Sequence, residues 1–162
     1  VSSKDVKKVI SERIKLYSHM KGKVLPLEEV NDEAFSTKAL GEGAAIEPIE
    51  GKLYSPCDGR VDMVFDTKHA ITLISDEGCE ILLHIGIDTV ELGGKYFEAY
   101  VTNGQNVNKG ALLIAFDMEA IKAAGYEVIT PVIVCNADDY KDVIRKTGVQ
   151  VEPGDTVMEL DK

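Results

Sequence analysis

Only three histidines occur in the 162-residue sequence: His19, His69 and His84. Imidazole is the side chain that most readily acts as a nucleophile, acid, base or metal ligand near neutral pH, so any such chemistry depends on these three residues. His69 and His84 stand in neighbouring apolar runs joined by residues 76–78, Asp-Glu-Gly, which are typical of a β-hairpin turn. The sequence therefore predicts two neighbouring imidazoles on one hairpin.

The length of the hairpin loop decides how the two rings lie. With a two-residue loop of Asp76 and Glu77, His69 lies opposite His84, and their Cβ atoms are about 5 Å apart. A three-residue loop shifts the register by one residue and puts the rings on opposite faces unless a bulge restores them. Both alternatives make the histidines close neighbours, and the sequence does not decide between them.

The residues around His84 indicate a functional rather than a structural histidine. Residues 81–83 and Ile85 are apolar, so a polar ring among them is costly unless it is hydrogen-bonded or reaches a surface depression. Gly86 permits a close approach of the backbone, and Asp88 lies within local reach. We therefore expect a reactive site at this end of the hairpin.

The elements that must hold this site are mostly strands. Short β-branched runs separated by Gly, Pro, Asn and Asp predict strands over 52–55, 59–65, 70–75, 79–85, 96–101, 112–117, 131–136 and 157–161. Only two later stretches look helical: 118–124, which stops at Gly125, and 138–146, which stops at Gly148. The expected fold class is all-β: an antiparallel β-sandwich or barrel with a few short helices.

Two weak internal echoes suggest that the sandwich contains two related halves. Residues 18–24, SHMKGKV, resemble residues 55–61, SPCDGRV. Residues 107–110, VNKG, resemble residues 151–154, VEPG, and each precedes an expected strand. The two echoes have different offsets, so they predict paired halves and not a tandem array.

The charge distribution suggests a boundary near residue 20. The net charge is −10, yet residues 1–23 carry seven Lys or Arg and only two Asp or Glu. Apolar residues at helical spacing in the first segment predict a helical linker over 1–20, in which His19 is inert, followed by one domain over 21–162. The acidic balance argues against nucleic acid and favours a basic protein partner.

The sequence gives no indication of export or membrane insertion. Its longest apolar runs are far shorter than the roughly 20 residues that a membrane helix needs, and no secretory signal opens the chain. The three cysteines contain no C-x-x-C pair, so neither a disulfide framework nor a thiolate zinc site is predicted. We expect a cytoplasmic domain.

Residues 84–92, HIGIDTVEL, resemble the phosphorylation-site motif of the glucose-type IIA domains of the bacterial phosphoenolpyruvate-dependent sugar phosphotransferase system. The resemblance covers roughly residues 20–160 in family order: GEGAAIEP (41–48), SPCDGRV (55–61), FDTKHA (65–70), NGQNVNKGALLIAFD (103–117) and ITPVIVCN (129–136). The stretch FDMEAIKAAGYEVITP (116–131) is similar to the β-glucoside and sucrose branch of the family.

The resemblance implies a chemical role for the histidine pair. His84 would accept a phosphoryl group on Nε2 from the phosphohistidine of the carrier HPr and pass it to a cysteine of a IIB domain. His69 would be the second active-site imidazole, with Thr67 hydrogen-bonded to it. The carbonyl of Gly86 would orient His84 through Nδ1. Neither a cofactor nor a metal is implied.

The resemblance also implies a docking surface for these partners. Asp32 and Asp88 match acidic positions that meet basic partner residues, and an apolar rim is matched by Phe35, Phe65, Leu82 and Val90. Leu82 and Thr72 stand where aromatic residues are common in the glucose type, so partner or sugar preference is expected to differ. The chain contains no IIB-like cysteine motif and no transport segment, so this chain alone moves no sugar, and fusion to IIB and IIC domains in a parent chain stays open.

Three other functions compete with this interpretation. A IIA-like domain that regulates a secondary sugar transporter would show the same motifs. A zinc hydrolase would use His69, His84 and Asp88 as ligands, but the sequence has no H-x-H or H-E-x-x-H pattern. A carrier of biotin or lipoate would need a lysine at a tight hairpin tip, which the sequence does not offer.

Overall fold

The fold is built almost entirely from short antiparallel strands. A computed structural model describes residues 13–162. Its elements are β1 (Ile14–Tyr17), β2 (Gly22–Pro26), η1 (Leu27–Glu29), α2 (Glu33–Ser36), β3 (Glu42–Pro48), β4 (Lys52–Tyr54), β5 (Gly59–Val64), β6 (Ala70–Ser75), β7 (Glu80–His84), η2 (Thr89–Leu92), β8 (Phe97–Ala99), β9 (Asn106–Val107), β10 (Leu112–Phe116), α3 (Met118–Ala123), β11 (Thr130–Val134), η3 (Ala137–Asp139), β12 (Asp142–Arg145), β13 (Gln150–Val151) and β14 (Thr156–Asp161). The expected antiparallel β-sandwich is confirmed.

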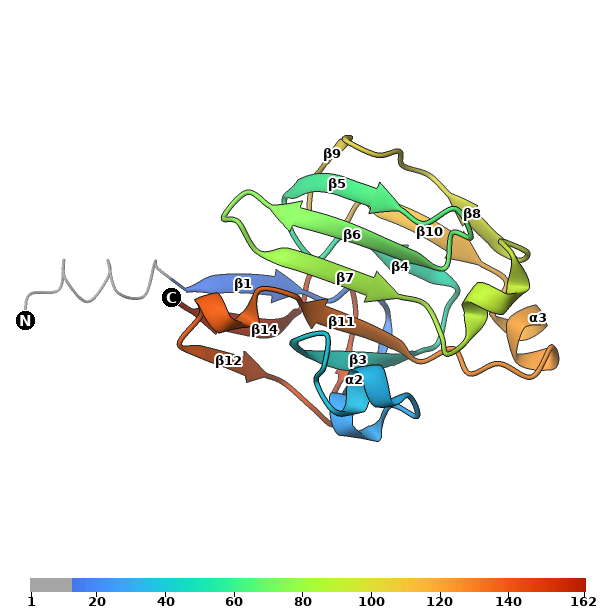
Figure 1. Ribbon diagram of the computed structural model, residues 1–162, viewed down its shortest axis with the longest axis horizontal. Coiled ribbons are helices and arrows are strands. Elements are labelled where there is room, and N and C mark those ends of the chain that lie inside the picture. The colour runs from blue at the N-terminus through green and yellow to red at the C-terminus, as the bar shows by residue number, and fades with distance from the viewer. Residues whose placement is uncertain (1–12) are drawn as a thin grey trace, which may run out of the picture.

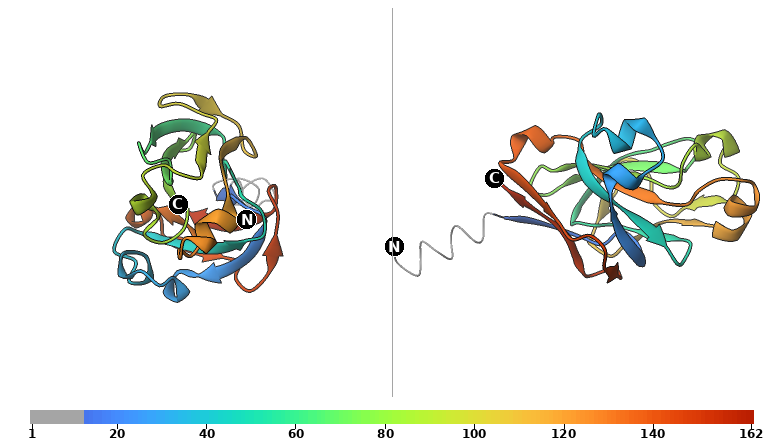
Figure 2. Two further views of the ribbon diagram at one scale, coloured as in Figure 1. Left: turned by 90° about the vertical axis from the view of Figure 1, so that its right-hand side faces the viewer. Right: turned by 90° about the horizontal axis from the view of Figure 1, so that it is seen from below.

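Three sheets enclose the main core. The largest has the order β13-β2-β3-β11-β7-β6-β5-β9, and two three-stranded sheets have the orders β4-β10-β8 and β1-β14-β12. The large sheet crosses the front of the molecule in Figure 1, with β4 and β10 behind it. Helix α3 lies at one end of the sandwich, and β1, β12 and β14 lie at the other (Figures 1 and 2).

Alternation of apolar and polar residues explains why the strands that carry the site form. In β7, Ile81 and Leu83 are buried in the main core, whereas Leu82 and His84 lie half-buried on the other face. Since side chains alternate across a strand, one face of this hairpin packs inward and the other carries the histidine. Strand β11 is buried along its whole length, as expected between two neighbouring strands.

Of the two later stretches expected to be helical, one is confirmed and the other is wrong. Helix α3 forms where 118–124 was expected to be helical. Residues 142–145 instead form β12, paired with β14, because Val143 and Arg145 alternate with exposed neighbours at the two-residue period of a strand.

The expected helical linker over residues 1–20 is not what the structure shows from residue 13 onward. Residues 1–12 lie outside the described residues. Residues 14–17 form β1, which pairs with β14, and Ile14 and Leu16 are fully buried while Lys15 between them is exposed. His19 is also fully buried rather than part of an exposed connector.

The echo between residues 18–24 and 55–61 corresponds to a repeated turn in the structure. The Ser18 hydroxyl donates to the Met20 carbonyl (2.5 Å), and the Ser55 hydroxyl donates to the Cys57 carbonyl (2.7 Å), so the same turn is built twice. The two turns also bind each other reciprocally, because Tyr17 N–H donates to the Pro56 carbonyl and Tyr54 N–H donates to the His19 carbonyl. The halves are therefore joined at their centre by an approximate two-fold relationship.

Candidate functional site

The hairpin that carries the histidines has the three-residue loop. Ala70 pairs with His84 and Ile74 with Glu80, and the Ser75 N–H donates to the Cys79 carbonyl across the loop. The alternative with His69 directly opposite His84 is therefore wrong.

The rings nevertheless meet, because His69 lies just beyond the last ladder pair. Its carbonyl accepts a hydrogen bond from the Ile85 N–H (2.7 Å), but it follows a turn in which Lys68 adopts a left-handed φ of 57°. Because His69 precedes the regular strand, its side chain need not follow the alternation of side chains between the two faces of β6. The ring centroids of His69 and His84 are 4.8 Å apart, and the planes are close to perpendicular at 86°.

Each imidazole has one nitrogen held by a neighbouring residue. His84 Nδ1 is 2.8 Å from the Gly86 carbonyl oxygen, and His69 Nδ1 is 2.7 Å from Thr67 Oγ1. A carbonyl can only accept, so His84 must carry its proton on Nδ1, which leaves the lone pair of Nε2 free. If the Thr67 hydroxyl donates to His69, the His69 proton sits on Nε2. The pair would then present a nucleophilic nitrogen beside an N–H donor.

Burial keeps both rings neutral. It lowers the pKa of His84 below its usual value, against the opposing effects of the Gly86 carbonyl and of Asp32 and Asp88. Burial, together with the nearby His84, lowers the pKa of His69 to about 4. At neutral pH, His84 is therefore in the form that can attack an electrophile.

Aromatic rings pack on the outer sides of the pair. Phe35, on α2, lies with its ring centroid 5.1 Å from that of His84, and Phe65 lies edge-on to His69 at 5.6 Å. Phe35 is only 3% exposed, so it packs against the imidazole more than it faces solvent. Phe65 is half-buried, and it offers more of its surface to a partner.

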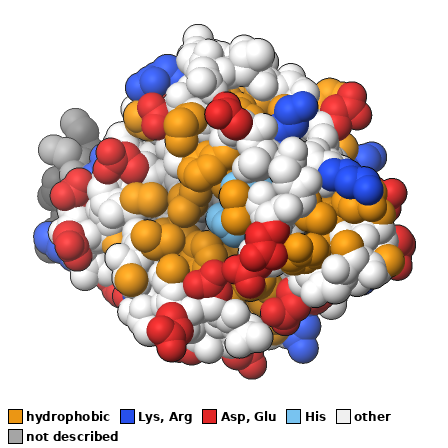
Figure 3. Space-filling view, turned by 45° about the vertical axis from the view of Figure 1, so that its right-hand side comes forward, with side chains coloured by type: hydrophobic (Ala, Val, Ile, Leu, Met, Phe, Trp, Pro, Cys, Tyr) orange, Lys and Arg blue, Asp and Glu red, His pale blue; other side chains and the backbone are white. Residues whose placement is uncertain are grey.

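The mouth of the site is apolar with an acidic border. Figure 3 shows the histidine in a hollow between hydrophobic surfaces, with a group of carboxylates directly beside it. Leu82 lies half-buried on the same face of β7 as His84, and Val90 on η2 is 52% exposed. Asp32 begins α2 by accepting the Ala34 N–H. Asp88, which precedes η2, has a left-handed φ of 59°.

The loop after His84 is braced by residues that the sequence did not single out. The Gly86 N–H donates to the Ile129 carbonyl (3.0 Å), and the Ile87 N–H donates to the Glu127 carbonyl (3.1 Å). A Cβ on Gly86, whose φ is 76°, would lie 2.5 Å from the Glu127 oxygen. The matched stretch ITPVIVCN contains Ile129 and was the sequence feature that could have indicated this contact. The motif alone did not show which of its backbone groups lie against Gly86.

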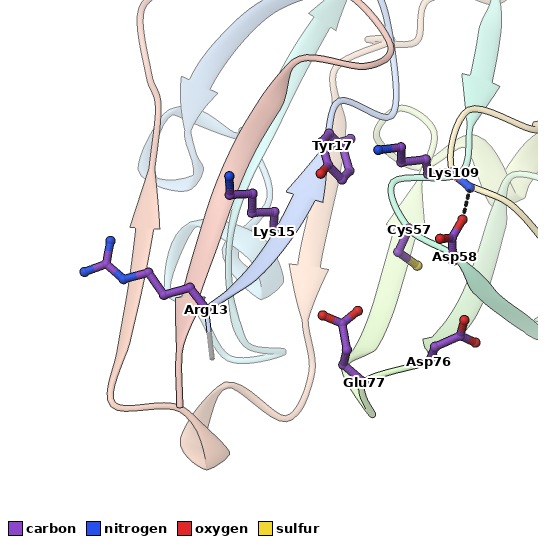
Figure 4. A pocket seen from close by; sticks show the side chains of 8 residues that line it. All are labelled: Arg13, Lys15, Tyr17, Cys57, Asp58, Asp76, Glu77 and Lys109. Carbon is purple, nitrogen blue, oxygen red and sulfur yellow. Dashed lines mark hydrogen bonds between the residues drawn. The ribbon is translucent and has the colours of Figure 1, made fainter. Parts of the chain in front are cut away.

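A second hollow lies at the opposite end of the hairpin. It has a volume of about 260 Å³ and is lined by Arg13, Lys15, Tyr17, Cys57, Asp58, Asp76, Glu77 and Lys109. Figure 4 shows that Arg13 and Lys15 point away from the carboxylates. The Lys109 ammonium lies 4.0 Å from the centroid of the Tyr17 ring, and its backbone N–H donates to Asp58. These side chains do not converge on a common point, so the hollow has no evident chemistry.

Within residues 13–162, no three His, Cys, Asp or Glu side chains are grouped so that they could hold a metal ion. In the same part of the chain, no helix has the length and apolar character needed to cross a bilayer.

Comparisons with known proteins agree on one family. Residues 14–140 match the family model described as phosphoenolpyruvate-dependent sugar phosphotransferase system, EIIA 1. The chain is 50% identical over 149 residues to a PTS system beta-glucoside-specific EIIBCA component of Halalkalibacterium halodurans, covering 92% of the chain and 23% of that protein. It is 40% identical to a PTS system glucose-specific EIIA component of Staphylococcus epidermidis, covering 92% of the chain and 90% of that protein.

A solved structure shows the same fold. Glucose permease IIA from Mycoplasma capricolum superposes with a TM-score of 0.83 at 36% identity, covering 91% of this chain and 95% of that one. The chain thus spans nearly all of a free-standing relative but only about a quarter of the beta-glucoside-specific relative.

Proposed function

Because the chain belongs to the EIIA 1 family of the phosphoenolpyruvate-dependent sugar phosphotransferase system, we propose that it is a phosphocarrier whose acceptor atom is His84 Nε2. The observation that carries the proposal is the hydrogen bond from His84 Nδ1 to the Gly86 carbonyl. It fixes the tautomer in which Nε2 keeps its lone pair, and Nε2 is the atom that must attack phosphorus.

The proposed reaction has two transfers of one phosphoryl group. In the first, His84 Nε2 forms a bond to phosphorus as the N–P bond in phospho-HPr breaks, and the HPr imidazole keeps the electron pair. In the second, a cysteine thiolate of a IIB domain forms an S–P bond as the N–P bond on His84 breaks. Little covalent work falls to the protein in such in-line transfers, so catalysis depends on position and charge.

His69 supplies a hydrogen-bond donor in this proposal. Its ring lies 4.8 Å from that of His84, and Thr67 holds its Nδ1. With Nε2–H directed at the site, it can donate to an oxygen of the arriving phosphoryl group. Thr67 acts indirectly as a positioning residue by fixing the His69 ring.

The partner-binding surface surrounds the hollow. Leu82, Phe65 and Val90 form the proposed apolar rim, and Asp32 and Asp88 give the acidic border that a basic partner would meet. Phe35 is proposed as a contact only at its edge, because it is almost fully buried against His84.

The proposed partners are HPr as donor and a IIB domain as acceptor. The beta-glucoside-specific relative carries A, B and C components in one chain, which supports a IIB partner close to this domain. We expect the domain to work in the cytoplasm, since Cys57, Cys79 and Cys135 are free thiols, as is usual in a reducing compartment.

Intact-mass measurement tests the acceptor assignment directly. The protein is incubated with phosphoenolpyruvate, enzyme I and HPr, and we expect one acid-labile phosphate per chain. His84→Ala should abolish this phosphate while the fold stays intact, as judged by circular dichroism. Phosphate retained on the variant would refute His84 as acceptor, whereas acceptance from phospho-HPr without onward transfer to IIB would favour a regulatory domain.

A further inference from the structure

His19 is a buried imidazole that the proposed reaction does not use directly. It is fully buried; its Nε2 lies 2.9 Å from the Thr130 carbonyl oxygen, and its Nδ1 has no hydrogen-bond partner among residues 13–162. Because a carbonyl only accepts, the His19 proton sits on Nε2 and Nδ1 is left unsatisfied. A buried polar atom without a partner is unfavourable, so the residue calls for an explanation.

The second copy of the same turn shows that the turn itself needs no imidazole. Pro56 occupies the position in the Ser55 turn that His19 occupies in the Ser18 turn, and both carbonyls accept a tyrosine N–H from the other half. The turn therefore forms equally well around a residue with no polar side chain. What distinguishes His19 is its bond to Thr130.

That bond is made to strand β11, beside His84, next to Pro131, which cannot donate a hydrogen bond to the neighbouring strand. Strand β11 lies between β3 and β7, and its pairing of Val132 with Leu83, continued by one residue, sets Pro131 opposite His84 (Figure 1). The Ile129 carbonyl faces β7, so the backbone nitrogen of Pro131, two residues on, faces β7 as well. Proline has no N–H to donate there, which is why it is rare inside sheets.

His19 holds the other side of the same peptide unit. The carbonyl that it binds belongs to the peptide between Thr130 and Pro131, and the next carbonyl back, Ile129, receives the Gly86 N–H. Gly86 in turn presents the carbonyl that fixes His84. A continuous series of short contacts thus leads from His19 to the nucleophile.

We infer that His19 is a positioning residue for His84: its Nε2–H anchors the Thr130 carbonyl and thereby steadies the segment of β11 against which the Gly86 loop is set. The role rests on the proposed phosphocarrier function, since it concerns the atom that accepts the phosphoryl group. Loss of one such neutral hydrogen bond changes an equilibrium constant by a factor of about two to ten.

The test compares three variants of the full chain labelled with ¹⁵N-histidine. In the unphosphorylated wild type, His84 should show a single tautomer with the proton on Nδ1. His19→Leu removes the donor, so we expect a mixture of His84 tautomers and phosphoryl acceptance from phospho-HPr slowed by about two- to tenfold. His19→Gln keeps an N–H within reach of Thr130 and should behave as wild type. Met20→Leu, a volume-conserving change in the same turn, is the matched control and should also leave His84 unchanged.

The melting temperature separates positioning from simple support. His19→Leu removes both the bond to Thr130 and the unpaired Nδ1, and these losses have opposite effects on stability, so we expect the melting temperature to change little while the His84 signals change. A single His84 tautomer and wild-type acceptance in His19→Leu would overturn the inference, as would the same disturbance in Met20→Leu. Should the leucine variant not fold, His19→Pro, which copies the Pro56 turn, is measured with the same expectations. The tautomer measurement needs no phosphoryl donor, so its outcome is independent of whether the wild type accepts phosphate.

Discussion

The most informative perturbation is His69→Gln, because it removes a potential cation and keeps a hydrogen-bond donor. Before phosphorylation His69 is neutral, since burial and the neighbouring His84 lower its pKa to about 4. A phosphoryl group on His84 Nε2 would bring negative charge close to the His69 ring, whose centroid lies 4.8 Å from that of His84. At the effective dielectric of partly buried sites, this attraction amounts to about 3 kcal/mol per unit charge, or roughly a hundredfold in an equilibrium constant.

Phosphorylation should therefore raise the pKa of His69 toward neutrality and turn it into an imidazolium that stabilises the phosphoryl oxygens. Glutamine can donate a hydrogen bond to the same oxygens but cannot take up this proton. We expect His69→Gln to accept phosphate from phospho-HPr but to transfer it to the IIB cysteine about a hundredfold more slowly.

Single-turnover transfer from purified phospho-protein to IIB measures the second step apart from the first. The ¹⁵N signals of His69, followed from pH 5 to pH 9 with and without the phosphoryl group, measure the shift of its pKa directly. If the variant transfers at the wild-type rate and the wild-type His69 signals do not move on phosphorylation, the ring is a structural neighbour and the two-histidine mechanism is wrong.

Three further predictions follow from other parts of the molecule. Val90→Lys puts a cation into an exposed apolar position that is proposed to face a basic partner, so acceptance at low phospho-HPr concentration should fall; unchanged donor dependence would remove Val90 from the proposed interface. Leu16→Ala should lower the free energy of unfolding by about 2–5 kcal/mol in urea titrations, because Leu16 is fully buried; a change below about 1 kcal/mol would mean that β1 contributes little. Burial lowers the pKa of His19 to about 4 from an unfolded value near 6.5, so the unfolded chain binds the proton first. The contribution of His19 to the free energy of unfolding should be fully present above pH 6.5 and be lost, by up to about 3 kcal/mol, as the pH drops through 4. If His19→Leu loses the same stability in acid, the loss belongs to other groups.

The sequence was sufficient to bring the two histidines together, but it did not determine how they meet. Their proximity followed from a single hairpin with an acidic Gly-containing turn, a short-range pattern that sequence shows well. The register depended on one residue of loop length, and the actual arrangement depended on His69 leaving the pleat after Lys68. Backbone geometry of that kind has no distinct sequence signature when the residue is not glycine.

Strands β1 and β12 were missed for a different reason. Each has four residues, and both pair with β14, so the partner of β1 lies at the other end of the chain. Four residues are too few to separate a two-residue period from a helical one, and the decisive contact is far away in sequence. His19 was assigned to a linker by the same error, because its burial results from packing between the two halves.

The pairing of Ile14 with Leu160 has a consequence for the order in which the protein is made. A ribosome adds residues at about 5–20 per second, so β1 is exposed for on the order of 10 s before β14 has been synthesised. During that time its apolar side chains, Ile14 and Leu16, have no partner strand, and such an edge readily pairs with other chains. The lysine between them is a typical protection against this pairing, and because β1 remains an edge strand of its sheet, Lys15 would protect the nascent chain and the finished fold alike.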